Sequence, residues 1–439
     1  MKTARQIAFE ALNKIERDKS YSNLTLDSVL YAANLSKADN SLVSALVYGV
    51  LERTLTIDYC LSRQLKQPLK KLKPQVLTAL RLGTYQLLFM DKIPQSAAVN
   101  ESVTLVKKNG CAFAAGLTNA VLRAVARDGL VLPDEEDIIH FYSIKYSFPE
   151  WLIKLWVESY GAENAVGIME SCAGRPPLTV RVNTLKTTKE KLVSFLADDG
   201  VTALSVNNID NALNLEKCGS IENLSAFNSG LFHVQDGASQ LCAAALDAKP
   251  GDTVLDLCSA PGGKAFTCAE KMENNGRIIA CDIHSHRLAL IKEGANRLGI
   301  NIIDVKRCDA SHFCEDMPQA DRVLCDVPCS GLGIVRRKPE IRFKAAQEIE
   351  KLPEIQYSIL TNAARYVKKG GRLIYSTCAL NPKENEEVCA KFLRENSNFE
   401  IVDISSVAPG AYTKNKTVTL MPHITQTDGF FIAAFERRI

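Results

Sequence analysis

Apolar residues in the first third of the chain recur every three to four positions, the spacing that places side chains on one face of a helix. One such stripe consists of Ile7, Ala8, Ala11, Leu12 and Ile15. A second stripe consists of Val43, Leu46, Val47, Val50 and Leu51. The pattern is interrupted by Pro74, Gly83, Pro94 and Gly110, where helices are expected to begin or end. It predicts an all-α domain over residues 1–130.

The pattern changes in residues 235–439, where short apolar runs alternate with amphipathic segments. Strands are predicted at 253–257, 277–282, 302–306, 321–326, 371–377 and 430–435. Helices are predicted at 263–273, 285–298, 353–367 and 383–395. Strands that alternate with helices form parallel β-α-β units, so this part is expected to be a doubly wound, Rossmann-like α/β domain.

Two shorter segments separate these domains. Residues 131–145, which contain Pro133 and the acidic run Asp134 to Asp137, are predicted to be a linker. Residues 146–234 combine a predicted helix at 151–160, an alternating strand at 178–183 and a helix at 189–196. We interpret this segment as a small α/β subdomain. Three domains agree with a chain of 439 residues, at roughly 100–200 residues per domain.

Charge is unevenly distributed along the chain. Residues 1–130 contain 18 Lys and Arg against 10 Asp and Glu, a net charge of +8, so the remainder carries −5 within a total of +3. A basic first domain suggests a module that faces a polyanion. An ordinary solvated basic face would give the same count, and charge alone does not separate the two explanations.

Cysteine usage and hydropathy indicate the compartment. The 14 Cys do not form the compact framework of a short secreted protein. No two are spaced as Cys-x-x-Cys and none of the six His has a zinc-finger spacing, so no structural metal is expected. The N-terminal residues have no apolar signal core, and no apolar run approaches the ~18 residues that span a bilayer. We expect a soluble, cytoplasmic protein.

The residues after the first predicted strand of the α/β domain indicate a ligand site. In a doubly wound sheet, ligands bind beyond the carboxyl ends of the strands. The segment from Asp256 to Lys264 lies at such an end, and Gly262 and Gly263 would let its backbone approach a ligand closely. The segment lacks the Gly-x-Gly-x-x-Gly pattern of dinucleotide-binding enzymes, which disfavours hydride transfer.

Acidic residues also follow the next predicted strands. Asp282 ends the second strand, 19 residues after Gly263, where a carboxylate can accept hydrogen bonds from ribose hydroxyls. Asp309 follows the third strand and Asp326 ends the fourth. Carboxylates that cap helices would explain one or two of these positions. Together with Asp256, four carboxylates at successive strand ends favour a binding site.

Two cysteines follow neighbouring predicted strands, in the sequences Asp326-Val327-Pro328-Cys329-Ser330 and Tyr375-Ser376-Thr377-Cys378-Ala379. A thiolate can add covalently to an unreactive heterocycle, which divides one difficult step into easier ones. A buried core thiol explains any single Cys better, but the pair at neighbouring strand ends favours a reactive role. Chemistry alone leaves open which Cys attacks. It also leaves open whether Lys264 lowers a thiol pKa or caps a carboxylate.

A basic run follows the first of these cysteines. It consists of Arg336, Arg337, Lys338 and Arg342. Basic side chains beside a reactive centre suit the phosphate backbone of a nucleic acid. A solvated loop with no ligand is the alternative.

At these residues the chain resembles the RNA cytosine-5 methyltransferases that use S-adenosylmethionine. The resemblance is carried by Asp256-Leu257-Cys258-Ser259-Ala260-Pro261-Gly262-Gly263-Lys264, Asp282, Asp309, Asp326-Val327-Pro328-Cys329-Ser330 and Thr377-Cys378. The first 130 residues resemble the NusB family of small all-α RNA-binding domains, through Leu46 to Leu51, Leu82 to Leu88, Ala97 to Glu101 and Thr118 to Arg123. This arrangement is similar to the Sun (Fmu) family of bacterial small-subunit rRNA cytosine-5 methyltransferases.

The resemblance implies roles for individual residues. A loop would wrap the methionine and ribose parts of the cofactor, and it consists of Cys258, Ser259, Ala260, Pro261, Gly262, Gly263 and Lys264. Asp282 would hold the ribose hydroxyls, Asp309 would lie beside the adenine, and Asp326 would face cofactor and cytosine. Cys378 would attack carbon 6 of the base and Cys329 would assist elimination. Asp326 would act as an acid at N3 if burial raises its pKa.

The implied activity is methylation of carbon 5 of one cytosine of 16S rRNA, position 967 in rRNA numbering, through a covalent adduct between Cys and cytosine. The partner would be 16S rRNA, free or in a partly assembled small subunit. One alternative is a cytosine-5 methyltransferase that acts on tRNA or 23S rRNA. Another is a non-catalytic RNA-binding ribosome assembly factor, against which the intact Cys378, Cys329 and Asp326 argue.

Overall fold

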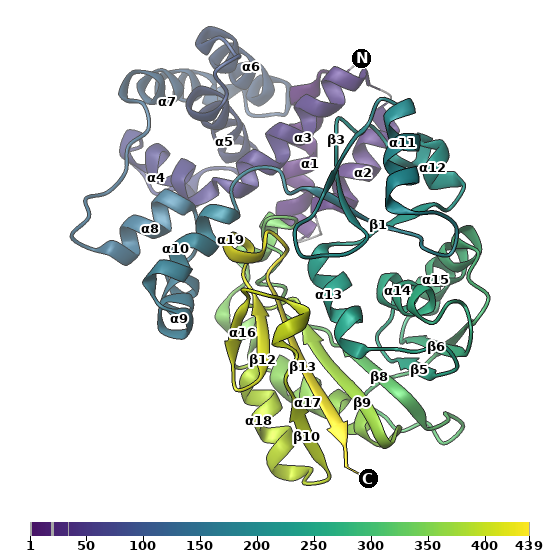
Figure 1. Cartoon of the computed structure of the whole chain (residues 1–439). Helices are drawn as coiled ribbons and strands as arrows, with labels where there is room; N and C mark the ends of the chain where they lie inside the picture. Colours follow the sequence, from purple (N-terminus) through teal and green to yellow (C-terminus); the bar gives the residue numbers. More distant parts are fainter. Residues whose placement is uncertain (1, 19–21, 34, 439) are drawn as a thin grey trace. The chain divides into compact units, whose positions relative to one another are not determined.

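The structure, a computed structural model, describes residues 2–18, 22–33 and 35–438 (Figure 1). The chain divides into two compact units. The first contains Met1–Gly174 and Val335–Lys344, and the second contains Arg175–Ile334 and Ala345–Ile439. Within the described ranges, no helix is both long and apolar enough to cross a membrane.

The first unit begins with the predicted helical domain. Its helices are α1 (Ala4–Asp18), α2 (Ser22–Ala33), α3 (Lys37–Glu52), α4 (Thr54–Gln64), α5 (Pro74–Phe89), α6 (Gln95–Lys108) and α7 (Ala115–Asp128). Two 3-10 turns, η1 (Leu69–Lys71) and η2 (Ala112–Ala114), precede α5 and α7. Both predicted apolar stripes are buried in one core. Pro74 begins α5, where its fixed backbone torsion suits the first helical turn.

Three further helices belong to the same unit: α8 (Ile138–Tyr146), α9 (Glu150–Tyr160) and α10 (Ala162–Ser171). The prediction of a linker at 131–145 is therefore wrong for residues 138–145. Asp137, in the acidic run that suggested a linker, instead caps α8 by accepting a hydrogen bond from His140 N at 3.1 Å. Phe141 and Ile144 of α8 are buried, which provides the apolar contact that keeps the helix folded.

The second unit begins with a small sheet of four antiparallel strands in the order β2-β3-β1-β4. The strands are β1 (Leu178–Val182), β2 (Thr202–Ser205), β3 (Ala212–Glu216) and β4 (Phe232–Val234). Helices α11 (Lys189–Asp198) and α12 (Ser225–Asn228) and the turn η3 (Ile221–Asn223) accompany it. The predicted small α/β subdomain is confirmed. Its sheet begins at Leu178, and the preceding helices α9 and α10 belong to the first unit.

The large sheet carries the predicted parallel strands β5 (Thr253–Asp256), β6 (Arg277–Asp282), β7 (Ile303–Arg307), β8 (Ala320–Asp326) and β9 (Val367–Thr377). Eight of its nine strands follow the order β11-β12-β13-β9-β8-β5-β6-β7, and the ninth, β10, pairs with β13. Four antiparallel strands complete it: β10 (Phe399–Val402), β11 (Tyr412–Lys414), β12 (Thr417–Leu420) and β13 (Phe430–Arg437). The predicted strand at 430–435 is thus confirmed, as an antiparallel neighbour of β9.

Helices cover both faces of this sheet (Figure 1). One face packs against α13 (Gly237–Leu246), α14 (Gly263–Lys271) and α15 (Ser285–Leu298), and the other against α17 (Leu352–Ala364) and α18 (Glu386–Glu395). Short turns are η4 (Pro339–Phe343), α16 (Ala346–Ile349), η5 (Ser405–Val407) and α19 (Pro422–Thr425). Neighbouring strand residues face opposite sides, as Val254 and Leu255 do, so both faces are apolar. The predicted doubly wound fold is confirmed.

Candidate active site

The carboxyl ends of the parallel strands meet at one edge of the large sheet. β5 ends at Asp256, β6 at Asp282, β8 at Asp326 and β9 at Thr377. β5 lies between β6 and β8, so the strand order reverses beside it. Such a reversal opens a crevice at the carboxyl ends, where doubly wound sheets bind ligands.

The loop between β5 and α14 is fixed by its backbone. Leu257 N donates to Leu324 O at 3.0 Å, and Ser259 N donates to Cys281 O at 2.8 Å. Gly262 has a φ of 106°, and a Cβ atom at this position would lie 2.6 Å from the Phe266 ring. Only glycine fits both conditions, so the loop returns tightly into α14 and leaves its polar atoms at the sheet edge.

Buried polar atoms lie at the beginning of this loop. Asp256 is 1% exposed. Among the described residues, neither its carboxylate oxygens nor Ser259 Oγ has a hydrogen-bond partner. Burial raises the pKa of Asp256 to about 7, because the charged form is poorly solvated. Unpartnered buried oxygens are costly, and they are atoms that the donors of a bound ligand could satisfy.

Asp282 is also buried, but it has partners. Its Oδ1 accepts a hydrogen bond from His284 N at 2.9 Å, and its Oδ2 lies 3.2 Å from Arg287 Nη1. Arg287 Nη2 donates to Ala260 O at 2.9 Å and so joins the ends of β5 and β6. Arg287 was not among the site residues predicted from the sequence. Its signal is a cation in the first turn of α15, where the helix dipole disfavours positive charge.

Asp309 follows β7 and makes local hydrogen bonds. Ser311 donates to its Oδ1 from the backbone N at 3.0 Å and from Oγ at 2.6 Å. These bonds hold the pKa of Asp309 below its usual value. The arrangement is a side-chain turn, and the carboxylate is 44% exposed.

Lys264 and Asp326 form an ion pair at the ends of α14 and β8. Lys264 Nζ lies 2.6 Å from Asp326 Oδ2, and Ser376 Oγ donates to Asp326 Oδ1 at 2.9 Å. Burial alone would lower the pKa of Lys264, but the charge of Asp326 outweighs it and raises that pKa above its usual value. Lys264 thus caps a carboxylate, which is one of the two roles considered for it.

The two predicted thiols are in direct contact. Cys329 follows β8, Cys378 follows β9, and their sulfur atoms are 2.9 Å apart. The hydrogen bond with Cys378 and then burial raise the pKa of Cys329 well above its ordinary value. Cys329 therefore keeps its proton near neutral pH and can donate it to the sulfur of Cys378.

One buried carboxylate holds the loop that carries Cys329. Glu384 accepts hydrogen bonds from Ser330 N, Gln356 Nε2 and Asn381 Nδ2, each at 2.9 Å. Gln356 Nε2 also donates to Pro328 O at 3.0 Å, on the other side of Cys329. The backbone around this thiol is thereby fixed from α17 and from the loop after β9.

The loop that carries Cys378 is held by Asn385. Thr377 Oγ1 donates to Asn385 Oδ1 at 2.6 Å, and Asn385 Nδ2 donates to Ala379 O at 2.8 Å. Gly333 N donates to Cys378 O at 2.9 Å, which joins the two thiol-bearing loops. Glu384 and Asn385 were missed from the sequence, although the run Asn381 to Asn385 directly after the second Cys motif is a signal for them.

Family models of known proteins match three parts of the chain. The model for 16S rRNA methyltransferase RsmB/F matches residues 243–436. The NusB family model matches residues 2–127, and the ferredoxin-like domain of RsmF/B-like methyltransferases matches residues 148–222. The three matches follow the chain in the order of the predicted domains.

Two curated relatives match along their full length. The chain is 39% identical to the probable ribosomal RNA small subunit methyltransferase B of Bacillus subtilis (strain 168), over 99% of each chain. The chain belongs to the ribosomal RNA small subunit methyltransferase B family. It is also 36% identical to the corresponding probable enzyme of Synechocystis sp., over 100% of each chain. The crystal structure of PH0851 matches at 28% identity with a TM-score of 0.84, over 100% of this chain and 99% of that one.

In this member of the methyltransferase B family, the basic run that follows Cys329 lies in the first unit, within Val335–Lys344. Arg336, Arg337 and Lys338 are half-buried. Arg342 is only 1% exposed, and its Nη1 donates to the backbone carbonyls of Glu52 and Ser147. The expectation that Arg342 contacts RNA phosphate is therefore corrected, because its guanidinium is occupied in anchoring this segment.

The predicted residues of the methyltransferase B domain are thus distributed in two groups. Lys264 pairs with Asp326, and Cys329 contacts Cys378, so that two separate pairs lie at the ends of the neighbouring strands β8 and β9. Asp256, Asp282 and the loop from Cys258 to Gly262 surround the ends of β5 and β6. In the described part of the chain, no group of three or more His, Cys, Asp or Glu side chains is arranged to hold a metal ion.

Proposed function

We propose that this protein methylates carbon 5 of a specific cytosine of 16S rRNA, at position 967 in rRNA numbering, with S-adenosylmethionine as cofactor. Membership of the methyltransferase B family supports the RNA methyltransferase activity. The observation that carries the mechanism is the pair of contacting thiols, Cys329 and Cys378, at the ends of neighbouring strands. The preferred state of the RNA would be free 16S rRNA or a partly assembled small subunit.

The residues at the ends of β5 and β6 fit the cofactor. The unpartnered oxygens of Asp256 and Ser259 can accept hydrogen bonds from a ligand, and Gly262 keeps the loop free of side-chain bulk. The loop from Cys258 to Lys264 would hold the methionine and ribose parts, with Asp282 at the ribose and Asp309 beside the adenine. Bound there, the cofactor would supply an electrophilic methyl group.

Cys378 is the nucleophile in this proposal. Its thiolate adds to carbon 6 of cytosine, so that a sulfur–carbon bond forms and the double bond between carbons 5 and 6 is converted into an enamine. The electron density that reaches the ring requires a proton at N3. Asp326 relays this proton, and the ammonium of Lys264, 2.6 Å away, compensates the carboxylate charge.

Cys329 acts after carbon 5 has been methylated. In the elimination, Cys329 takes up the proton from carbon 5 while its own proton passes to the departing sulfur of Cys378 at 2.9 Å, and the electron pair restores the ring double bond as the bond from carbon 6 to Cys378 breaks. The raised pKa of Cys329 keeps this proton on the thiol until elimination. The same raised pKa makes Cys329 a poor nucleophile near neutral pH.

Labelled methyl transfer to rRNA tests the proposed activity and the two roles together. Cys378→Ala should abolish transfer, because no covalent adduct can form, while cofactor affinity should remain nearly unchanged. Cys329→Ala should stall after methyl transfer. A denaturing gel should then show a slowly migrating, nuclease-sensitive protein band only when cofactor and RNA are both present.

Further measurements distinguish the proposed roles of the two cysteines and the proposed substrate from their alternatives. The double variant, with Cys378 and Cys329 both replaced by Ala, should give no band, since no sulfur remains to form the bond. A trapped band in Cys378→Ala and none in Cys329→Ala would reverse the two roles. Bisulfite sequencing after reaction with 16S rRNA, 23S rRNA and tRNA should locate the modified cytosine. Modification of 23S rRNA or tRNA alone would reject the proposed substrate.

A further inference from the structure

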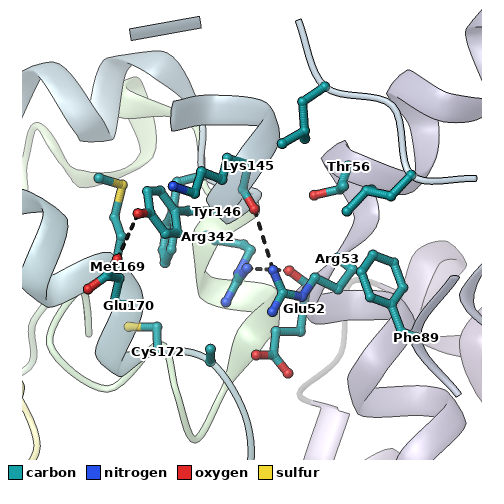
Figure 2. A pocket seen from close by; sticks show the side chains of 14 residues that line it. Glu52, Arg53, Thr56, Phe89, Lys145, Tyr146, Met169, Glu170, Cys172 and Arg342 are labelled. Carbon is teal, nitrogen blue, oxygen red and sulfur yellow. Dashed lines mark hydrogen bonds between the residues drawn. The ribbon is translucent and has the colours of Figure 1, made fainter. Parts of the chain in front are cut away.

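The first unit contains a cavity that no part of the proposed mechanism uses (Figure 2). Its volume is about 450 Å³, within the range of roughly 300–1,000 Å³ that is usual for small-ligand sites. One wall comes from the junction of α3 and α4 and the end of α5, and the facing wall comes from α8 and α10 (Figure 2). All the residues that line the cavity belong to this unit.

Two cations lie beside aromatic rings in this cavity. The Arg53 guanidinium is 5.4 Å from the centroid of the Phe89 ring, and Arg53 Nη1 donates to Lys145 O at 3.4 Å. Lys145 Nζ is 5.0 Å from the centroid of the Tyr146 ring. Figure 2 shows that Arg53 and Lys145 extend from opposite walls.

Arg342 adds a third positive charge. It is buried, and its guanidinium carbon lies 4.4 Å from the centroid of the Phe148 ring. Burial lowers the pKa of Arg342 to about 10, so the group remains protonated at neutral pH. Its Nη1 bonds to two backbone carbonyls, which compensate the charge only partly.

The two carboxylates that line the cavity accept hydrogen bonds from other groups of the protein. Glu52 Oε1 accepts a hydrogen bond from Gly174 N at 2.7 Å, and Glu170 Oε1 accepts one from Tyr146 Oη at 2.8 Å. Three cations therefore face two carboxylates, which leaves the lining with one net positive charge. The cavity favours an anionic ligand that also offers a flat apolar surface to Phe89 and Tyr146.

We propose that this cavity binds one unpaired nucleotide of the RNA substrate. The base would stack on the Phe89 or Tyr146 ring, and the phosphate would lie between Arg53 and Lys145. The inference rests on the proposed function, because RNA is the proposed substrate. A nucleotide joins a planar ring and a phosphate in one molecule, which matches the alternation of aromatic and cationic side chains in the two walls.

Charge-neutral variants test the phosphate contacts. Arg53→Gln and Lys145→Gln should each weaken binding of a fluorescent single-stranded 16S rRNA fragment by roughly tenfold, as expected for the loss of a hydrogen bond to a charged group. The matched control is Lys154→Gln, in α9 of the same unit, where the side chain is 56% exposed. This control removes the same charge outside the cavity and should change affinity by less than about twofold.

Photo-crosslinking of the unaltered protein provides a measurement that does not depend on the folding of a variant. RNA that carries 5-iodouridine should cross-link to peptides that contain Phe89 or Tyr146. In competition, AMP and CMP should displace the RNA only at far higher concentration than the oligonucleotide does. Cross-links confined to other peptides would overturn the proposal, and so would equal losses in the Lys145→Gln and Lys154→Gln variants. Displacement by AMP as strong as by RNA would identify a free-nucleotide site instead.

Methyl transfer by the unaltered protein is measured in parallel and separates the two proposals. If the protein methylates rRNA and the cavity variants bind RNA normally, the cavity inference fails while the proposed function stands. If the protein transfers no methyl group but the cavity variants lose RNA binding, the proposed function fails while the cavity inference stands. Fluorescence of the two tryptophans, Trp151 and Trp156 of α9, reports whether each variant is folded, since Trp156 is buried beside Phe148 at 5.3 Å between ring centroids.

Discussion

Asp256 and Asp326 have the same side chain in very different surroundings. Asp326 pairs with Lys264 at 2.6 Å and accepts a hydrogen bond from Ser376. Asp256 ends the neighbouring strand β5 and is buried without a hydrogen-bond partner among the described residues, and its pKa rises to about 7. The difference means that one carboxylate has an ion-pair partner and a hydrogen-bond donor, whereas the other changes charge near neutral pH.

The raised pKa of Asp256 predicts a pH-dependent stability. In the unfolded chain the carboxyl loses its proton near pH 4, but in the folded protein only near pH 7. The folded state therefore binds the extra proton between these values, and stability falls as pH rises through this window. Asp256→Asn, which cannot ionise, should gain stability relative to the unaltered protein between pH 5 and pH 8, by on the order of 3 kcal/mol.

Scanning calorimetry without cofactor at the two pH values measures this difference. Glu315→Gln, at an exposed position in the same unit, is the control and should leave the pH profile unchanged. Parallel pH profiles for Asp256→Asn and the unaltered protein would show that Asp256 ionises normally when folded.

The loops at the ends of individual strands position the reactive groups. The loop from β5 to α14 depends on Gly262, while the loops after β8 and β9 depend on Glu384 and Asn385. None of these three residues takes part in the proposed bond changes. Each fixes a backbone path at the sheet edge, so the geometry of the site is a property of the strand ends rather than of the reactive side chains alone.

Replacement of Gly262 by Ala tests the element that forms the cofactor loop. The methyl group would meet the Phe266 ring at 2.6 Å, in a backbone conformation with φ of 106°. Gly251→Ala is the matched control, because Gly251 has a φ of 91° but has open space around it. Thermal unfolding should show a loss of about 1–2 kcal/mol for the control from backbone strain.

Gly262→Ala should lose at least about 1 kcal/mol more, as is usual for overpacking, and should also weaken cofactor binding. Equal losses for the two variants would mean that Phe266 moves aside without cost.

The excess of positive charge and the reactive side chains belong to different compact units of the protein. Residues 1–130 carry a net charge of +8. The reactive groups lie in the other compact unit, which contains Arg175–Ile334 and Ala345–Ile439. Exposed lysines cluster around η1, at Lys66, Lys70, Lys71 and Lys73. Such a cluster would bind phosphate and release counterions, which makes affinity depend on salt.

Salt titration of RNA binding by the full-length protein tests this division. Affinity should fall linearly on a double-logarithmic plot against salt concentration. Replacement of Lys70 and Lys71 together by Gln should reduce the slope by up to about 1.4, at roughly 0.7 per phosphate contact with single-stranded nucleic acid. Replacement of Lys414 and Lys416 by Gln, two exposed lysines in the other unit, should leave the slope unchanged. The reverse result would place the phosphate contacts in the methyltransferase unit.

The linear pattern of the sequence determined the helical stripes of the first domain and the parallel strands of the large sheet, but it did not reveal α10, α13 or the strands β2–β4 and β10–β12. Apolar stripes with a period of 3.6 residues, such as the one from Ile7 to Ile15, correctly predict which face of a helix is buried. A continuously apolar face is sufficient for a helix to pack against the core. The strands that end at Asp256, Asp282 and Asp326 are confirmed for the same reason, since parallel strands buried on both faces are short apolar runs. Helix α8 was missed because its nine residues have apolar side chains on all sides, which gives no single stripe, and because they follow an acidic run that resembles a linker.

Tertiary structure decided which groups meet. Cys329 and Cys378 are 49 residues apart in sequence, and their contact at 2.9 Å arises only because β8 and β9 pair in parallel register. The ion pair between Lys264 and Asp326 likewise joins elements 62 residues apart. Arg342 shows the converse, since a basic residue that suggested RNA binding is buried once its segment folds back into the first unit. The local sequence indicates whether each residue prefers water or a buried position. Which partner pairs with a charge or shares a proton depends on how distant segments of the chain pack together.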